Sequence, residues 1–317
     1  MKAIRYTLAA ALTVIAAASC QDTIAPEQTQ ESGIIINATI EDTQTKTELG
    51  EGTPGSDGKV HHKVLWKNTD NISVFDRNGN NHRFRTWTAG EVAKFRLITG
   101  EYTGTDFISA DEYHAIYPGD EGNSINYNNK TISTSIATTQ TAIMNGFATD
   151  LSVAYGFGTA IYNESDKTYI DMTFRNITAL VKFEIVGEEV KQFTLLNKDG
   201  HKIGGDFTIA YGADDLVISA GTADRIHLNN ITSEKVGNVT TYTANDLTAG
   251  IYYIALVPVE FRPRIRIYSG DLTPNSSNFN YSSGDGLIDF YGSNSVVLKP
   301  GMILDLGKFD SKGRVEE

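Results

Sequence analysis

The sequence predicts an all-β protein, and three features of the chain point to that fold class. From Val64 onward, apolar residues recur at every second position, as they do in strands that bury one face. Turn-forming residues interrupt this alternation at roughly the 8–12-residue spacing typical of sandwiches. No window keeps the 3.6-residue apolar repeat of an amphipathic helix for more than about two turns.

A short apolar segment and the later alternation together predict a series of strands. The first, Ile34–Ile40, stands apart because polar residues precede it and the glycine-rich stretch Thr43–Lys63 follows it. Removing such a strand from a sandwich would leave an open groove edged by unpaired backbone groups. The Asn78-Gly79 pair predicts a hairpin between two later strands. The other strands are expected at Ile72–Phe75, His82–Arg85, Tyr169–Phe174, Leu180–Ile185, Lys191–Leu196, Phe207–Ile209, Leu216–Ile218, Ile251–Val257, Ile265–Ile267 and Val296–Leu298.

The length of the chain predicts two domains. One β-sandwich usually holds about 100–150 residues, which is too few for this chain. The polar stretch Asn163–Thr168, directly before a new strand, is the most suitable joint. We therefore expect two tandem β-sandwiches, at residues 34–165 and 166–310, followed by a charged and mobile tail at residues 311–317.

The first residues have the pattern of a secretory signal peptide, expected at residues 1–19. Lys2 and Arg5 precede an apolar run from Leu8 to Ala18, which is too short to span a bilayer as a helix. The polar residues 20–33 that follow are expected to form a flexible tether. The chain is therefore predicted to be exported.

Cys20 is the only cysteine and follows Ala17, Ala18 and Ser19. This arrangement resembles the lipobox of bacterial lipoproteins, in which the cysteine is acylated and becomes the new N-terminus. Acyl chains hold a protein at a membrane surface without spanning the membrane. The alternative is an ordinary signal peptide with Cys20 near the cleavage point by chance.

The charge of the chain is strongly acidic, with a formal net charge of −12. Loss of Lys2 and Arg5 with the signal peptide leaves 25 basic and 39 acidic residues, a net charge of −14. This excess of negative charge disfavours nucleic acid and anionic membrane surfaces as partners. With a single cysteine, the fold is expected to have no internal disulfide.

No catalytic, metal or cofactor site is predicted. His61 and His62 would point to opposite faces of a strand, and zinc sites usually need three or four ligands. The segment Asp76–Asn80 faintly resembles a calcium loop, but a hairpin turn explains it better because Asn-Gly needs no ion. Adjacent carboxylates diverge on a strand, so they do not form the facing pair of a glycosidase. Such adjacent pairs occur at Asp111-Glu112, Glu188-Glu189 and Asp214-Asp215.

Arg262, Arg264 and Arg266 are expected to share one face of a strand, with Phe261, Pro263, Ile265 and Ile267 on the other. Such a row could bind an acidic neighbouring subunit or an anionic glycan. The alternative is an edge strand protected from aggregation by its charges and by Pro263. Tyr281, Phe290 and Tyr291 could stack on sugars or belong to the core.

A series of short motifs runs over most of the chain. The motifs are Trp66 with Asp70–Phe75, Phe95 with Gly100 and Gly104, Tyr113–Pro118, Phe174-Arg-Asn176 with Leu180–Phe183, Gly204–Phe207, Gly250–Ala255 with Pro258, and Lys299–Gly301. Each motif alone is weak, but in their order and spacing they resemble the fimbrillin family, the fimbrial subunits and fimbrillin-like lipoproteins of type V pili.

This resemblance implies two transthyretin-like sandwich domains, export as a lipoprotein and a place in a fimbrium at the surface of the outer membrane. It also implies other fimbrial subunits as partners. In the stalk subunits of that family, a protease cuts after an arginine and removes the N-terminal strand, and a strand of another subunit fills the groove. Such strand addition supplies backbone hydrogen bonds and fills alternate side-chain pockets.

One feature departs from the family pattern. No arginine lies between Cys20 and Arg77, so release of the first strand would need a cut at Lys46, Lys59 or Lys63. A subunit that keeps its first strand would act as an anchor or a terminal component.

Met302, Leu304 and Leu306 alternate near the C-terminus and predict a final strand. It could be a donor strand or simply the last strand of the second domain. The sequence thus predicts a non-enzymatic, lipid-anchored fimbrial protein that contributes to adhesion. The alternative is a surface glycan-binding lipoprotein of a polysaccharide-uptake system, whose partner would be a host or bacterial glycan.

Overall fold

The computed structural model describes residues 34–41, 49–54, 60–86, 88–98, 112–148, 151–164, 167–187, 189–212, 215–237, 239–269 and 287–315. The named secondary-structure elements in these ranges are all strands, which confirms the predicted all-β class. In this part of the chain, no helix has the length and apolar character needed to span a membrane.

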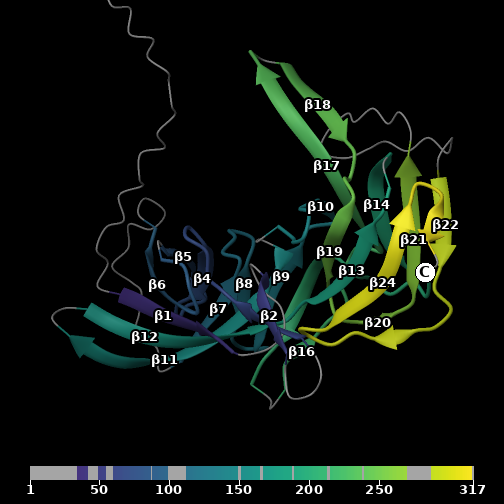
Figure 1. Cartoon of the computed structure of the whole chain (residues 1–317). Coiled ribbons are helices and arrows are strands. Elements are labelled where there is room, and N and C mark those ends of the chain that lie inside the picture. Colours follow the sequence, from purple (N-terminus) through teal and green to yellow (C-terminus); the bar gives the residue numbers. More distant parts are fainter. Residues whose placement is uncertain are drawn as a thin grey trace, which may run out of the picture.

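Seven strands form a closed barrel, drawn at the left of Figure 1. Every neighbouring pair in the barrel is antiparallel except β1 and β12, which run parallel. Trp66 fills the interior and lies edge-on to Phe95, Tyr117 and Phe174, with ring centroids 5.0–5.5 Å apart. In order around the barrel, the strands are β1 (Ile34–Ile40), β12 (Lys167–Asn176), β11 (Ala154–Glu164), β7 (Tyr113–Tyr117), β4 (Asn71–Phe75), β5 (Asn81–Thr86) and β6 (Val92–Leu97).

Two further sheets face each other at the right of Figure 1. Phe183 and Phe193, one from each sheet, stack with centroids 3.8 Å apart, and Phe309 packs edge-on against both rings. One sheet contains β10 (Thr139–Thr141), β17 (Arg225–Val236), β14 (Val190–Asn197), β21 (Pro263–Ser269) and β22 (Leu287–Tyr291), with β18 (Val239–Asn245) paired to β17. The other contains β19 (Gly250–Leu256), β13 (Ala179–Ile185), β24 (Ile303–Asp310) and β25 (Gly313–Val315).

The barrel and the two facing sheets share one apolar core. Phe75, Ile116 and Tyr155 of the barrel strands belong to the same buried cluster as Phe183 and Phe193. Strand β7 is therefore buried on both faces, and all five of its residues are buried. This arrangement holds the two parts of the chain together through apolar burial.

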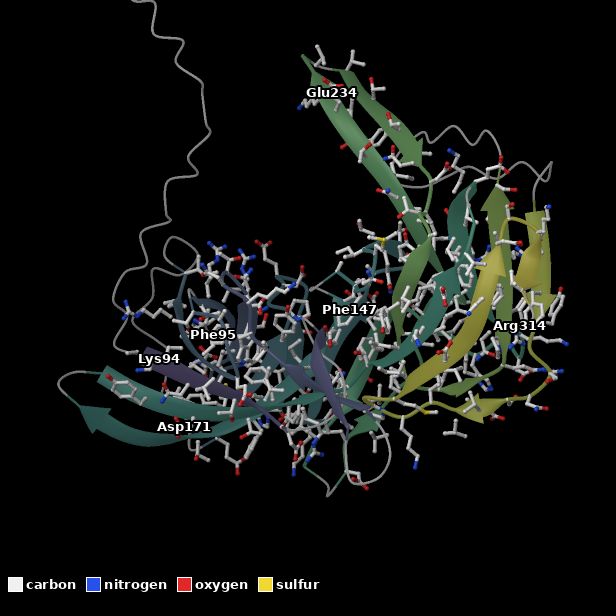
Figure 2. The ribbon with its side chains drawn as sticks, in the orientation of Figure 1. Lys94, Phe95, Phe147, Asp171, Glu234 and Arg314 are labelled. Carbon is white, nitrogen blue, oxygen red and sulfur yellow. The ribbon has the colours of Figure 1, made fainter. Side chains whose placement is uncertain are left out.

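A third sheet links the two halves of the sequence. Its order is β16 (Val217–Ile218), β15 (Gly205–Ala210), β9 (Thr131–Ile136) and β8 (Ser124–Asn126). Two short ladders complete the fold, β2 (Leu49–Pro54) with β3 (Val60–Val64) and β20 (Glu260–Phe261) with β23 (Val296–Val297). The far half of the β17–β18 hairpin projects from the body of the protein, with Glu234 near its end in Figure 2.

The strand pairing corrects the expected boundary between residues 165 and 166. The predicted joint Asn163–Thr168 lies in the hairpin that connects β11 and β12, where Glu164 pairs with Lys167. Both strands belong to the barrel, so the chain leaves the barrel only after Asn176. In addition, β9 and β10 pair with β15 and β17 of the later half, so the two units are interleaved in sequence.

The predicted mobile tail at residues 311–317 is also corrected in part. Residues 313–315 form β25, which pairs with β24 through Phe309 and Arg314. The guanidinium of Arg314 lies over the ring of Phe290, 5.8 Å from its centroid. These contacts explain why a charged segment continues the sheet.

Candidate functional site

The first candidate site is the position that β1 occupies in the barrel. Strand β1 lies between β12 and β6 and closes the barrel by pairing with both. Ile36 and Ala38 are fully buried in the barrel interior, and Ile35 is 6% exposed. Burial of one isoleucine side chain contributes about 1.5–3 kcal/mol. Ile34–Ile40 was predicted as a separate strand, and the structure confirms the strand with the same bounds.

Polar contacts hold the same strand at its exposed face and its end. Asn37 Nδ2 donates to Asp171 Oδ1 at 2.8 Å, and the backbone N–H of Glu41 donates to the Phe174 carbonyl at 2.8 Å. The Glu41 carboxylate pairs with Arg175 at 2.7 Å, and both side chains are more than 40% exposed. Exposed ion pairs contribute little, about 0–1 kcal/mol. Apolar burial and the backbone ladders therefore provide most of the stability of β1.

The pairing of β1 with two barrel strands has a direct consequence. Without β1, the pairing edges of β12 and β6 would both lose their hydrogen-bond partners, and the barrel interior would open between them. Another strand with apolar residues at alternate positions could satisfy both edges. Strand β1 is therefore the element that completes the hydrogen bonding of two barrel strands and closes the barrel.

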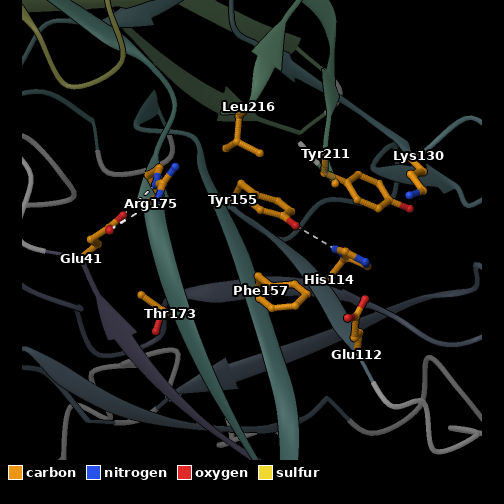
Figure 3. A pocket seen from close by; sticks show the side chains of 11 residues that line it. Glu41, Glu112, His114, Lys130, Tyr155, Phe157, Thr173, Arg175, Tyr211 and Leu216 are labelled. Atoms are coloured by element: carbon orange, nitrogen blue, oxygen red, sulfur yellow. Dashed lines mark hydrogen bonds and ion pairs between the residues drawn. The ribbon is translucent and has the colours of Figure 1, made fainter. Parts of the chain in front are cut away.

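The second candidate site is a cavity of about 450 Å³ at the junction of the barrel and the third sheet (Figure 3). The barrel contributes the end of β1 and the strands β7, β11 and β12. The third sheet contributes the loop between β8 and β9 and the segment between β15 and β16. Side chains from these two sides are Glu41, Glu112, His114, Tyr155, Phe157, Thr173 and Arg175, and Lys130, Tyr211 and Leu216.

Aromatic rings form one wall of the cavity. His114 Nδ1 lies 2.9 Å from the hydroxyl of Tyr155, and the centroid of its ring lies 4.2 Å from that of Tyr211. The rings of Tyr155 and Tyr211 are nearly parallel, with centroids 6.4 Å apart. Phe157 lies 5.5 Å from His114 and is 40% exposed. Burial lowers the pKa of His114 to about 4, so the ring is neutral near pH 7.

No protein-family model matches the chain, and no curated protein is similar to it in sequence. Solved structures similar to it include fimbrial and cell adhesion proteins, in agreement with the predicted resemblance. A proposed cell adhesion protein from Bacteroides ovatus is 12% identical, with a TM-score of 0.46 and coverage of 90% of this chain and 98% of that one.

Two fimbrial proteins from Porphyromonas gingivalis are also similar. The tip fimbrial protein Mfa3 is 8% identical, with a TM-score of 0.29 and coverage of 81% of this chain and 80% of that one. The fimbrial anchor protein Mfa2 is 10% identical, with a TM-score of 0.27 and coverage of 74% of this chain and 78% of that one. The likeness is too distant to assign a role to any residue of this chain.

The arginine row lies on β21 and its immediate flank. Arg264 forms two hydrogen bonds with Asp289 of β22, and Arg266 Nε lies 3.4 Å from the same carboxylate. Arg262 donates from Nε to the Gly292 carbonyl at 3.1 Å and lies 3.9 Å from Asp199. Hydrogen bonding from Arg264 lowers the pKa of Asp289. Much of the positive charge of the row is therefore neutralised within the chain.

Two details of the arginine row follow from the strand pairing. The predicted alternation is confirmed, because Pro263, Ile265 and Ile267 are buried and face away from the arginines. The alternative of a protective edge strand is wrong, because β21 pairs with β14 on one side and β22 on the other.

The C-terminal residues Met302, Leu304 and Leu306 pack against the shared core of their own chain. Strand β24 pairs with β13 in parallel and with β25 in antiparallel orientation. The structure thus places Leu304 and Leu306 in β24, the last long strand of the fold, and Met302 directly before it. Their use as a donor strand stays a prediction.

The predicted hairpin at Asp76–Asn80 is confirmed. Asp76 Oδ1 accepts hydrogen bonds from the backbone N–H groups of Asn78 and Asn80 at 2.8 and 2.9 Å. Its Oδ2 atom lies 3.1 Å from Nε2 of the buried His82. Burial pushes the pKa of Asp76 upward, but the hydrogen bonds from Asn80 and His82 outweigh it, and the pKa is lowered. The carboxylate is thus already used by the turn.

The remaining candidate residues of the sequence analysis lie in different parts of the chain. His61 and His62 lie in β3, and the described residues hold no group of three or more His, Cys, Asp or Glu side chains suited to a metal ion. Phe290 packs against the core, whereas Tyr291 is 44% exposed beneath Lys198 and Arg264. Cys20, Tyr281 and one member of each acidic pair lie outside the described residues.

Sequence reasoning missed the aromatic cavity. Its residues come from six separate segments, and none of them forms a motif along the chain. The only local signal is the histidine within the apolar strand Tyr113–Tyr117.

Proposed function

We infer that this chain is an exported structural protein of fimbrial type, held at the outer membrane through a lipid on Cys20, that contributes to cell adhesion. The observation that carries this proposal is the position of β1 in the barrel. An N-terminal strand that closes a barrel between two pairing edges is the element that assembly by donor-strand exchange would replace. The signal-like N-terminus and the fimbrillin-like motifs support the same function.

Within this proposal, the chain acts as an anchor or a tip component rather than a repeating stalk unit. Strand β1 occupies its own barrel, and the segment between Cys20 and Arg77 offers no arginine for cleavage. A barrel that keeps its first strand cannot accept a donor at the same edges. The two transthyretin-like sandwiches expected from the resemblance belong to this proposal as well.

Electrophoresis in SDS of the outer-membrane fraction and of sheared filaments, unheated and heated, tests the proposal. An anchor or tip component is expected as a single band near its full mature mass that is recovered with the filaments. A ladder that collapses on heating would instead make the chain a repeating, strand-exchanged subunit. A chain that is absent from both filaments and ladders would contradict the fimbrial function.

A matched variant separates processing from retention of the strand. Lys46→Gln, Lys59→Gln and Lys63→Gln together remove the three lysines between β1 and Trp66, the residue that fills the barrel interior. If a ladder forms in the wild type and is lost in this variant, cleavage at a lysine releases β1. If the variant and the wild type both give a single band, β1 is retained.

A second candidate function is a glycan-binding surface lipoprotein. The cavity lined by His114, Tyr155, Phe157 and Tyr211 favours it, because aromatic rings beside charged groups suit a saccharide. Recovery of the chain with filaments separates the two candidates, since a lipoprotein of an uptake system would not be sheared off with pili.

A further inference from the structure

The cavity between the barrel and the third sheet has a composition that neither the strand exchange nor the fold requires. Its volume of about 450 Å³ lies within the range of about 300–1,000 Å³ typical of small-molecule sites. We propose that this cavity binds a neutral saccharide of one or two rings, with Phe157 and Tyr211 as the stacking surface.

The cavity offers exposed aromatic ring surface to a ligand. Phe157 is 40% exposed on β11, whereas most large apolar side chains of the barrel are buried. Concave sites that bind small molecules are typically lined by apolar and aromatic side chains with a few polar groups. The ring of Tyr211 comes from the third sheet and contacts His114 in the same aromatic wall (Figure 3). The apolar C–H face of a sugar ring would cover these surfaces.

The cavity also offers both hydrogen-bond donors and acceptors to a ligand. Glu112 supplies a carboxylate that can accept hydrogen bonds, and Lys130 supplies an ammonium group that can donate them. Sugar hydroxyls both donate and accept, so each hydroxyl can pair with either group. Lys130 forms no ion pair with another described residue, which leaves its charge available to a ligand.

The charge of the cavity favours an uncharged ligand. Arg175 is already paired with Glu41 at 2.7 Å, so Lys130 and Glu112 remain as one positive and one negative group. His114 adds no charge near pH 7, because burial keeps its ring neutral. With a net charge of −12 on the whole chain, an acidic sugar would meet repulsion without a compensating cluster of cations.

The side chain of Lys130 lies close to Gly212. Gly212 has a φ of +89°, and a Cβ atom added there would lie 3.1 Å from Lys130 Cδ. The backbone N–H of Tyr211 donates to the carbonyl of Lys130 at 3.0 Å. The end of the Lys130 side chain, from Cδ to Nζ, therefore lies close to Gly212, the neighbour of Tyr211 in the cavity lining.

The test is binding of the full chain, purified in detergent, to an array of neutral and acidic oligosaccharides, followed by calorimetry with the neutral disaccharide that binds best. We expect binding to at least one neutral saccharide. Phe157→Ala and Glu112→Gln are each expected to weaken it at least tenfold. Tyr291→Ala, which removes another partly exposed aromatic ring on β22, is expected to leave it within twofold.

Three results would overturn the proposal: no neutral saccharide binds, only acidic saccharides bind, or Phe157→Ala binds as the wild type does. Thermal unfolding of each variant separates loss of the site from loss of the fold, and the exposed positions of Phe157 and Glu112 make unfolding avoidable. The measurement does not depend on filament assembly, so a failure of the fimbrial proposal and a failure of this one are distinguishable.

Discussion

Asn37 on β1 and Asp171 on β12 stand opposite each other in the parallel ladder and share a hydrogen bond of 2.8 Å from Nδ2 to Oδ1. The bond lies on the outer surface, whereas the neighbouring Ile36 points into the barrel and is fully buried. One strand thus carries an exposed polar contact with its neighbour and an apolar contact with the barrel interior, one residue apart.

This difference predicts unequal effects of two neighbouring substitutions. Ile36→Asp places a carboxylate in the apolar interior and is expected to lower the free energy of unfolding by more than about 3 kcal/mol. Asn37→Ala removes one exposed hydrogen bond and is expected to cost about 0.5–1.5 kcal/mol. Urea unfolding measures both. Equal losses of unfolding free energy in the two variants would contradict the burial of Ile36 and the exposed hydrogen bond of Asn37.

Gly158 predicts a second stability effect in the same barrel. A Cβ atom at this position would lie 2.2 Å from the Asp171 carbonyl oxygen and 2.7 Å from Met172 Cγ. Strands β11 and β12 would have to separate, so Gly158→Ala is expected to cost about 1–3 kcal/mol. Gly146→Ala is the control, because its added Cβ would meet Ile143 at an ordinary 3.6 Å. A melting temperature unchanged by Gly158→Ala would contradict the close packing of these strands.

The buried histidines predict a loss of stability in mild acid. Burial lowers the pKa values of His114 and His227 to about 4, below the ordinary value near 6.5. Between these values the unfolded chain binds more protons than the folded one, so stability is present above about pH 6.5 and falls as the pH decreases toward 4. His114→Gln is expected to reduce the slope of melting temperature against pH in this window.

The exposed His201 provides the control for this experiment, since His201→Gln should leave the slope as it is in the wild type. Carboxylates with lowered pKa values, such as Asp76 and Asp289, also respond to acid, and they do so equally in all three proteins. A slope that is the same with and without His114 would show that this ring is not held neutral by burial.

Much of the fold could be predicted because its signals are local. The apolar segment Ile34–Ile40 and the Asn78-Gly79 turn predict one strand and one hairpin without reference to distant residues. Pairing partners are a different matter, since alternation identifies a strand but not its neighbour. Nothing near Thr131–Ile136 indicates that it pairs with Gly205–Ala210 in the later half.

The hairpin formed by β17 and β18 was missed for a related reason. Its far half projects into solvent, where neither face is buried, so its sequence lacks the apolar alternation used to predict strands. Val236 and Val239 at its end are 70% and 66% exposed. The cavity was missed because Tyr155 and Tyr211 meet only through the packing of the barrel against the third sheet. A contact between segments that lie far apart in the chain leaves no spacing to detect.

The proposed acylation of Cys20 predicts how the chain distributes between membrane and solution. Two or more acyl chains make attachment durable, whereas the described part of the fold contains no helix able to span a membrane. Cys20→Ala is therefore expected to move most of the chain from the membrane pellet to the soluble fraction, measured by fractionation and detergent phase partitioning. Ser19→Ala keeps the cysteine and a small residue before it, so it should remain in the pellet. If Cys20→Ala stays in the pellet, another segment holds the chain, and the lipid anchor is excluded as the sole attachment.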